Sequence, residues 1–174
     1  MVFATVGTDH HPFDRMIRWV DRWLGANVDR GVTGFVQTGT SASPQRARSA
    51  DYLGYEQMEA AMRDAIAVVT HGGPGSIMLC SYLGKKSIVV PRRASLGEHV
   101  DDHQVLFSRR LAAEGQIELA ETEERLGELL DRALVHGATL ASPSERDRVA
   151  RTAKRFERLV DELLTRRPLD AHDA

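Results

Sequence analysis

The stretch Ile66-Ala67-Val68-Val69-Thr70-His71-Gly72-Gly73-Pro74-Gly75-Ser76 decides the fold, because an apolar run is followed there directly by a glycine-rich turn. The run, residues 66–70, shows no alternation of polar and apolar side chains, which is typical of a strand covered on both faces of a parallel sheet. The turn leads into further apolar residues as far as Leu83, and Gly84 then marks a helix end. These residues predict a strand, a tight turn and a helix, the repeating unit of α/β proteins.

The same order of strands and helices continues in both directions along the chain. Short apolar runs predict further strands at 2–6, 34–38, 50–53, 87–90 and 116–119. Apolar residues at helical spacing predict helices at 12–24, 55–64, 99–114 and 123–136. The predicted fold class is therefore α/β, a Rossmann-like parallel sheet with helices on both faces, in one domain spanning residues 1–140.

Residues 141–174 are predicted to add a C-terminal helix and a tail. Val149, Phe156 and Leu163 lie at helical spacing, and basic side chains occupy the other faces. Such a helix either folds back on its own sheet or forms a docking surface for a partner near anionic lipid headgroups. The sequence leaves both interpretations open.

Composition excludes several classes of protein. The 23 basic and 25 acidic side chains give a formal charge of -2, so the excess of positive charge that marks nucleic-acid-binding proteins is absent and no nucleic-acid partner is expected. The single cysteine, Cys80, permits neither an intrachain disulfide nor a cysteine zinc cluster. No apolar run approaches the roughly 20 residues that span a bilayer, and the N-terminus does not resemble a secretory signal. We therefore expect a cytoplasmic protein.

In an open parallel sheet, ligands bind beyond the carboxyl ends of the strands. The predicted strand ends carry the segments 7–11, 38–44, 71–76 and 91–104, where small, polar and histidine residues are concentrated. In the segment 71–76, glycines allow close approach of the backbone, and the following helix start offers unpaired N–H groups and a partial positive charge. These features favour a phosphate or pyrophosphate site, to which Ser76 can add a hydroxyl donor or a helix cap. The alternative is a tight turn without a ligand.

The segment 91–104 is crowded with groups that form hydrogen bonds. Its arginines can bind an anion, and its carboxylates and carboxamide can bind sugar hydroxyls. The alternative for the carboxylates is that they only cap a helix, because acidic side chains near a helix start are stabilising. The residues are Arg92, Arg93, Glu98, Asp102 and Gln104. His99 and His103 lie one helical turn apart, but no third metal ligand is evident, so no metal site is expected.

The first loop, Gly7-Thr8-Asp9-His10-His11, contains two histidines that can act as a base or as phosphate donors. The alternative is that both are solvated surface side chains.

Four groups of residues resemble the C-terminal domain of glycosyltransferase family 28, the donor half of a GT-B enzyme. They are Thr5-Val6-Gly7-Thr8, then residues 69–76, then residues 83–91, and finally Glu98-His99 with Asp102-His103-Gln104. The resemblance covers roughly residues 2–136, and the glycine turn combined with the histidine–glutamine pair about thirty residues later is its most specific part.

The resemblance implies a UDP-sugar-binding subunit of an inverting, two-subunit glycosyltransferase that acts in polysaccharide biosynthesis. It resembles the small subunits of the dolichol-pathway N-acetylglucosaminyltransferase and of bacterial exopolysaccharide pairs. It implies a membrane-anchored partner that binds a lipid-linked sugar acceptor, and hence a peripheral position at the inner face of the membrane. No cofactor or metal is expected. The alternative is a non-catalytic regulatory module that binds a sugar nucleotide.

The resemblance also implies roles for individual residues. The diphosphate would be held by the turn and the residue before it, that is by His71, Gly72, Gly73, Pro74, Gly75 and Ser76. The rest of the donor would be met by Arg92, Glu98, His99, Asp102, His103 and Gln104, and the acceptor cleft would be bordered by Gly7, Thr8 and His10. His10 or His11 is the expected base, unless the partner supplies it.

One position departs from the family pattern. Many relatives have a ribose-binding glutamate three residues after the Ser/Thr of the turn, but this chain has Leu79 there. Glu98 is the expected replacement.

Overall fold

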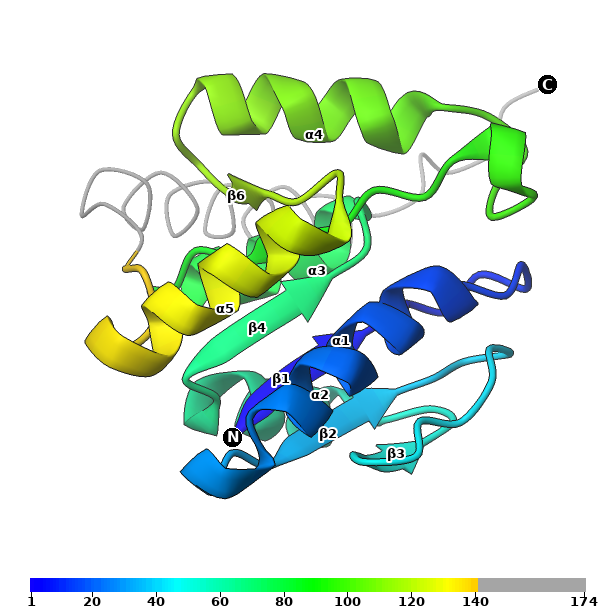
Figure 1. The fold of residues 1–174 in the computed structure, drawn as a ribbon. Coiled ribbons are helices and arrows are strands. Elements are labelled where there is room, and N and C mark those ends of the chain that lie inside the picture. The colour runs from blue at the N-terminus through cyan, green and yellow to red at the C-terminus, as the bar shows by residue number, and fades with distance from the viewer. Residues whose placement is uncertain (141–174) are drawn as a thin grey trace, which may run out of the picture.

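Six parallel strands form one sheet in the computed structural model of the protein, which describes residues 1–140 (Figure 1). The strand order is β3-β2-β1-β4-β5-β6. The strands are β1 (Val2–Thr5), β2 (Gly34–Gln37), β3 (Arg48–Ala50), β4 (Ala67–Thr70), β5 (Ile88–Val89) and β6 (Glu118–Leu119). Every neighbouring pair is parallel, so all six carboxyl ends lie along the same edge. The predicted α/β class is confirmed.

Helices cover both faces of this sheet. They are α1 (Asp14–Ala26), α2 (Tyr55–Asp64), α3 (Pro74–Tyr82), α4 (His103–Ala113) and α5 (Glu123–His136), with single 3₁₀ turns at Val28–Arg30 and Ala94–Leu96. In Figure 1, α1 and α5 lie in front of the sheet, and α2 and α3 lie behind it. For α1, α2 and α3 this follows from the strand order. The chain runs from β1 to β2 through α1 and in the opposite direction, to β4 and β5, through α2 and α3, and right-handed crossovers in opposite directions leave their helices on opposite faces.

The core consists of one cluster on each side of the sheet and a smaller third one. The largest joins α1 and α5 to sheet residues such as Val36 and Val69. On the opposite face, Phe3 and Val68 pack against Met62 of α2 and Cys80 of α3. Cys80 is therefore a buried apolar side chain, and burial raises the pKa of its thiol to about 12.

Several boundaries differ from the prediction. The expected strand at 50–53 is found at Arg48–Ala50, where polar residues pair with β2, and the strands near 87–90 and 116–119 are only two residues long. The helix expected from residue 99 begins at His103, because Gly97 is left-handed (φ +70°) and side chains hold the following segment as a loop. Among these contacts, the carboxylate of Asp102 accepts a hydrogen bond from the N–H of Ala94 at 2.9 Å.

The expected helix and tail at 141–174 lie outside the described residues. Within residues 1–140, no helix combines the length and the apolar character that a membrane crossing requires.

Candidate functional site at the carboxyl edge of the sheet

The loops after β1, β4 and β5 meet at the centre of the carboxyl edge, because these three strands are neighbours in the sheet. The imidazole of His71 lies against Gly7, and the N–H of Gly72 donates to Gln104. The loop after β2 joins them, since Thr40 Oγ1 donates to the carbonyl oxygen of His10 at 3.0 Å. The structure therefore brings together the four segments that the sequence placed at strand ends.

His71 fills the space between the first loop and the glycine turn. A Cβ at Gly7 or at Gly73 would lie less than 3.0 Å from the imidazole, closer than real Cβ atoms come, and Gly7 also has a left-handed backbone (φ +80°). Gly72 is equally confined, since its Cβ would lie 2.8 Å from Cβ of Gln104. These glycines are therefore required by packing within the chain. Gly75 is different, because no atom of residues 1–140 lies within 4 Å of the position of its Cβ.

Burial also changes the titration of His71. Desolvation lowers its pKa to about 4, and the positive charge of Arg92 acts in the same direction, against smaller opposing effects of Thr5 and Asp9. Its buried Nδ1 has no hydrogen-bond partner within the part of the chain that the structure describes. At neutral pH the ring is therefore uncharged, so it does not offer a positive charge to a phosphate.

Helix α3 begins beside this ring with a set of open backbone donors. Gly73 is the N-cap residue and makes no side-chain cap, and Pro74 is the first helical residue. Pro74 and Gly75 are exposed, so the N–H groups of Gly75 and Ser76, which have no intrahelical acceptor, lie near solvent. Leu79 is partly buried in the core cluster behind the sheet. The start of α3 therefore combines free donors with the positive end of the helix dipole.

Gln104, in the first turn of α4, braces the glycine turn. Its Oε1 accepts hydrogen bonds from the N–H groups of Gly72 (3.1 Å) and Arg92 (3.5 Å). Because both partners are donors, the carboxamide oxygen must face them, and Nε2 is left without a partner among the described residues. An open cavity of about 420 Å³ adjoins it, lined by Gly72, Pro74, His103, Gln104, Leu106 and Phe107.

Arg92 is turned away from the cleft, contrary to the expectation that it meets an anion. The side chain is fully buried, and its guanidinium donates to the carbonyl oxygens of Val6 (2.8 Å), His11 (2.6 Å) and Glu98 (2.8 Å). Arg92 therefore ties the loop after β1 to the loop after β5. It contributes to the site by positioning these loops.

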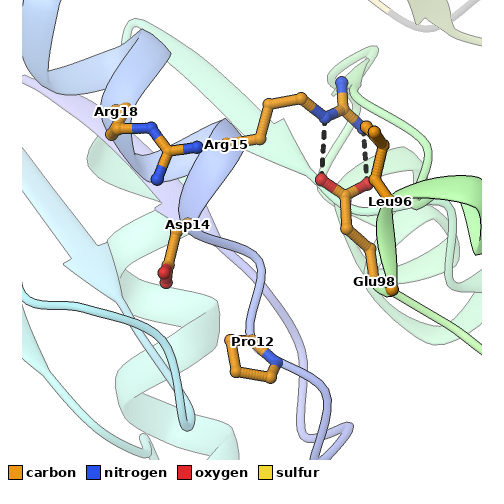
Figure 2. Close-up of a pocket in the computed structure, with 7 residues that line it drawn as sticks. Pro12, Asp14, Arg15, Arg18, Leu96 and Glu98 are labelled. Atoms are coloured by element: carbon orange, nitrogen blue, oxygen red, sulfur yellow. Dashed lines mark hydrogen bonds and ion pairs between the residues drawn. The ribbon is translucent and has the colours of Figure 1, made fainter.

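Glu98 is also engaged within the protein. Its carboxylate pairs with Arg15 through two hydrogen bonds, Nε–Oε1 at 2.8 Å and Nη2–Oε2 at 2.7 Å, as Figure 2 shows. Oε2 also accepts from the N–H of Arg93 at 3.0 Å. The pair lines an open cavity of about 490 Å³ together with Pro12, Asp14, Arg18, Leu96 and Gly97 (Figure 2). The structure thus gives Glu98 a structural partner in place of the expected free carboxylate.

Asp9, which the sequence interpretation did not select, organises the histidines. Oδ1 lies 2.6 Å from Nδ1 of His11, and Oδ2 lies 3.7 Å from Nε2 of His99. Partial burial raises the pKa of Asp9, but hydrogen bonds from the backbone and ring of His11 and the charge of Arg92 lower it to about 2. The only signal in the sequence was an aspartate directly before two histidines.

The other expected site residues lie near the surface. Thr8 and His10 are exposed on the first loop, and Asp102 and His103 are exposed at the start of α4. His103 Nδ1 lies 2.8 Å from the carboxylate of Asp101, which also lies 3.3 Å from Nδ1 of His99.

Solved structures with a similar fold are glycosyltransferases. The calicheamicin glycosyltransferase CalG4 has a TM-score of 0.59 at 14% identity, with 96% of this chain and 42% of that chain covered. SnogD from Streptomyces nogalater has a TM-score of 0.52 at 16% identity, with 90% and 39% covered. The glycosyltransferase VinC, solved in complex with DTDP, has a TM-score of 0.53 at 19% identity, with 94% and 40% covered.

This chain therefore spans less than half the length of each of these enzymes. A search of curated proteins finds no significant match. The sequence itself matches the model of one protein family, the glycosyltransferase family 28 C-terminal domain, over residues 1–163. The fold agrees with this match, since the similar structures are GT-B glycosyltransferases. The chain belongs to the glycosyltransferase family 28 C-terminal domain family.

Proposed function

We propose that this chain is the UDP-sugar-binding subunit of an inverting, two-subunit glycosyltransferase. In this proposal, the partner is a membrane-anchored subunit that binds a lipid-linked sugar acceptor, and the reaction belongs to polysaccharide biosynthesis. Family membership supports the assignment to glycosyl transfer. The chain spans 42% of the length of CalG4, so the activity of a whole enzyme is part of the proposal. The partner would keep the chain at the cytoplasmic face of the membrane.

The observation that carries the proposal is the start of α3. The N–H groups of Gly75 and Ser76, which have no intrahelical acceptor, lie there with a hydroxyl group and the positive helix end, beside a cavity of about 420 Å³. A diphosphate carries the negative charge that such a helix start stabilises. The presence of DTDP in the structure of VinC, which has a similar fold, favours a nucleoside diphosphate as the ligand.

The same arrangement would assist the reaction without a metal ion. When the bond between sugar and diphosphate breaks, negative charge develops on the departing diphosphate, and fixed donors stabilise that charge most strongly when it is fully formed. The free Nε2 of Gln104 adds one donor on the side of α4. We assign the orientation of the donor sugar to Gln104 with its neighbours Asp102 and His103.

Inversion requires that the acceptor hydroxyl attack the sugar from the side opposite to the diphosphate while a base removes its proton. His11 is the base that this chain offers, because Asp9 Oδ1 lies 2.6 Å from Nδ1 and so directs the lone pair to Nε2. Gly7, Thr8 and His10 lie on the same loop and would border the acceptor. A base from the partner is the alternative.

Calorimetry with UDP and a panel of UDP-sugars tests the proposal. In the variant Gln104→Glu, a carboxylate oxygen still accepts from the N–H of Gly72, but the free donor is lost and a negative charge faces the diphosphate. We expect UDP affinity to fall at least about tenfold, corresponding to about 1.4 kcal/mol.

Gln57→Glu is the matched control, because Gln57 in the first turn of α2 accepts from the N–H of Gly54 at the same distance of 3.1 Å. This variant should bind UDP as the natural chain does. Absence of uridine-nucleotide binding, with or without a partner, would refute the proposal. UDP binding without transfer in the presence of any partner would instead favour a regulatory module.

A further inference from the structure

A second cluster of polar side chains lies in the loops after β1 and β5, and one of its members, His99, has no role in the proposed function. The carboxylate of Asp9 and the imidazoles of His10 and His11 each place one ligand atom within 4.8 Å of the others. His99, which lies 88 residues further along the chain than His11, brings Nε2 to 3.7 Å from Asp9 Oδ2. The loops after β1 and β5, the two strands that flank β4, thus approach each other at Asp9.

The separations in this group match those of metal ligands. With bonds of about 2.0–2.1 Å, two ligands of a tetrahedral zinc ion lie about 3.3 Å apart. Asp9 Oδ1 lies 2.6 Å from Nδ1 of His11 and 3.9 Å from Nδ1 of His10. The distance from Asp9 Oδ2 to Nε2 of His99 is 3.7 Å, so each imidazole lies within about 0.7 Å of the required separation from one oxygen of this carboxylate.

The chemistry of the donors selects the class of ion. One carboxylate and three imidazoles suit zinc and similar transition ions, whereas calcium and magnesium require several oxygen ligands. The guanidinium of Arg92 lies nearby but donates to backbone carbonyls, so it supplies a positive charge and takes no ligand.

From this geometry we infer that Asp9, His10, His11 and His99 form a binding site for a divalent transition-metal ion of the zinc class. The site is separate from the diphosphate site at the start of α3. An ion bound here would engage Asp9 and His11, so the base for transfer would then come from the partner, the alternative named above. The sequence offered His99 and His103 as a pair without a third ligand. The structure instead directs His103 to Asp101 at 2.8 Å and provides the missing ligands from the first loop.

Cobalt(II) is a suitable probe, because its visible absorption reports tetrahedral coordination by nitrogen and oxygen. We would titrate the tag-free, chelator-treated full chain with Co²⁺, measure Zn²⁺ binding by calorimetry, and compare the double variant His10→Ala/His99→Ala. We expect one ion per chain in the natural protein and an affinity at least about tenfold lower in the double variant.

His136→Ala provides the control, since His136 lies at the end of α5, away from the cluster, and removes an imidazole without touching the site. Its affinity for Zn²⁺ should equal that of the natural chain. Circular dichroism checks that the double variant is folded. The single variant His10→Ala, at a side chain that is 83% exposed, repeats the test without changing His99, which is 21% exposed, and should also bind Zn²⁺ more weakly. The inference is overturned if the natural chain binds no stoichiometric ion, or if the double variant binds it equally well.

Discussion

Acidification should destabilise the protein through His71. The pKa of this side chain is about 4 in the folded chain and 6.5 in its ordinary environment. The unfolded chain therefore takes up a proton before the folded chain does, and the free energy of unfolding falls as the pH drops from 6.5 toward 4. For these two values, linkage gives a loss of about 2 kcal/mol between pH 7 and pH 5.

The structure separates this effect from that of the nearby carboxylate. The pKa of Asp9 is lowered from 3.8 to about 2, so the stability that Asp9 contributes is present above 3.8 and is lost only below it. His71 therefore acts in a pH window that Asp9 does not affect.

Urea unfolding at pH 7 and pH 5 measures the effect in the natural chain and in His71→Asn, which cannot titrate in this range. The difference between the two pH values should be smaller in the variant by about 2 kcal/mol. His136→Asn, at an exposed position on α5, should retain most of the pH dependence of the natural chain. The reasoning fails if the variant and the natural chain lose stability equally, or if nuclear magnetic resonance shows the imidazole of His71 titrating near 6.5.

Three further substitutions test other contacts. Gly73→Ala places a methyl group less than 3.0 Å from the neighbouring imidazole and should cost about 1–3 kcal/mol in thermal unfolding, whereas Gly75→Ala, with open space around its Cβ, should be nearly neutral. Lys85→Met removes the ammonium group that donates to three carbonyls at the end of α2 and should cost about 1–3 kcal/mol in urea unfolding. Lys86→Met removes no side-chain hydrogen bond found within residues 1–140, so it should not have this cost. Glu98→Gln removes the negative charge opposite Arg15, whose side chain is only 11% exposed, and should cost about 3–5 kcal/mol, while unchanged UDP affinity would show that this carboxylate does not bind ribose.

The order of strands and helices was readable from the sequence because the central strands are buried on both faces. Such strands are continuous apolar runs, and glycines or prolines mark their ends. The start of α4 was not readable. Glu98 and Asp102 resemble the acidic first turn of a helix, yet Glu98 pairs with Arg15, which lies 83 residues away. A contact at that separation leaves no local signal.

The candidate site was likewise predictable from the sequence only in part. Parallel strands carry their carboxyl ends to one edge, so the loops that meet there were predictable. The direction of a side chain was not: Arg92 points inward because three carbonyl oxygens accept its N–H groups, and carbonyls are common to every residue. His71 packs between the first loop and the glycine turn, and Asp9 contacts histidines of two loops. Both roles depend on distances between loops, which the sequence does not show.

The two outer strands of the sheet are unusually brief, three residues in β3 and two in β6. A long exposed outer strand is a template for pairing with another chain and for fibrillar aggregation. Arg48 also places a positive charge on the outer strand β3. Its guanidinium carbon lies 5.5 Å from the centre of the Phe35 ring. We therefore expect the two edges of the sheet to contribute little to self-association at high concentration. This favours preparing the chain on its own for biochemical work.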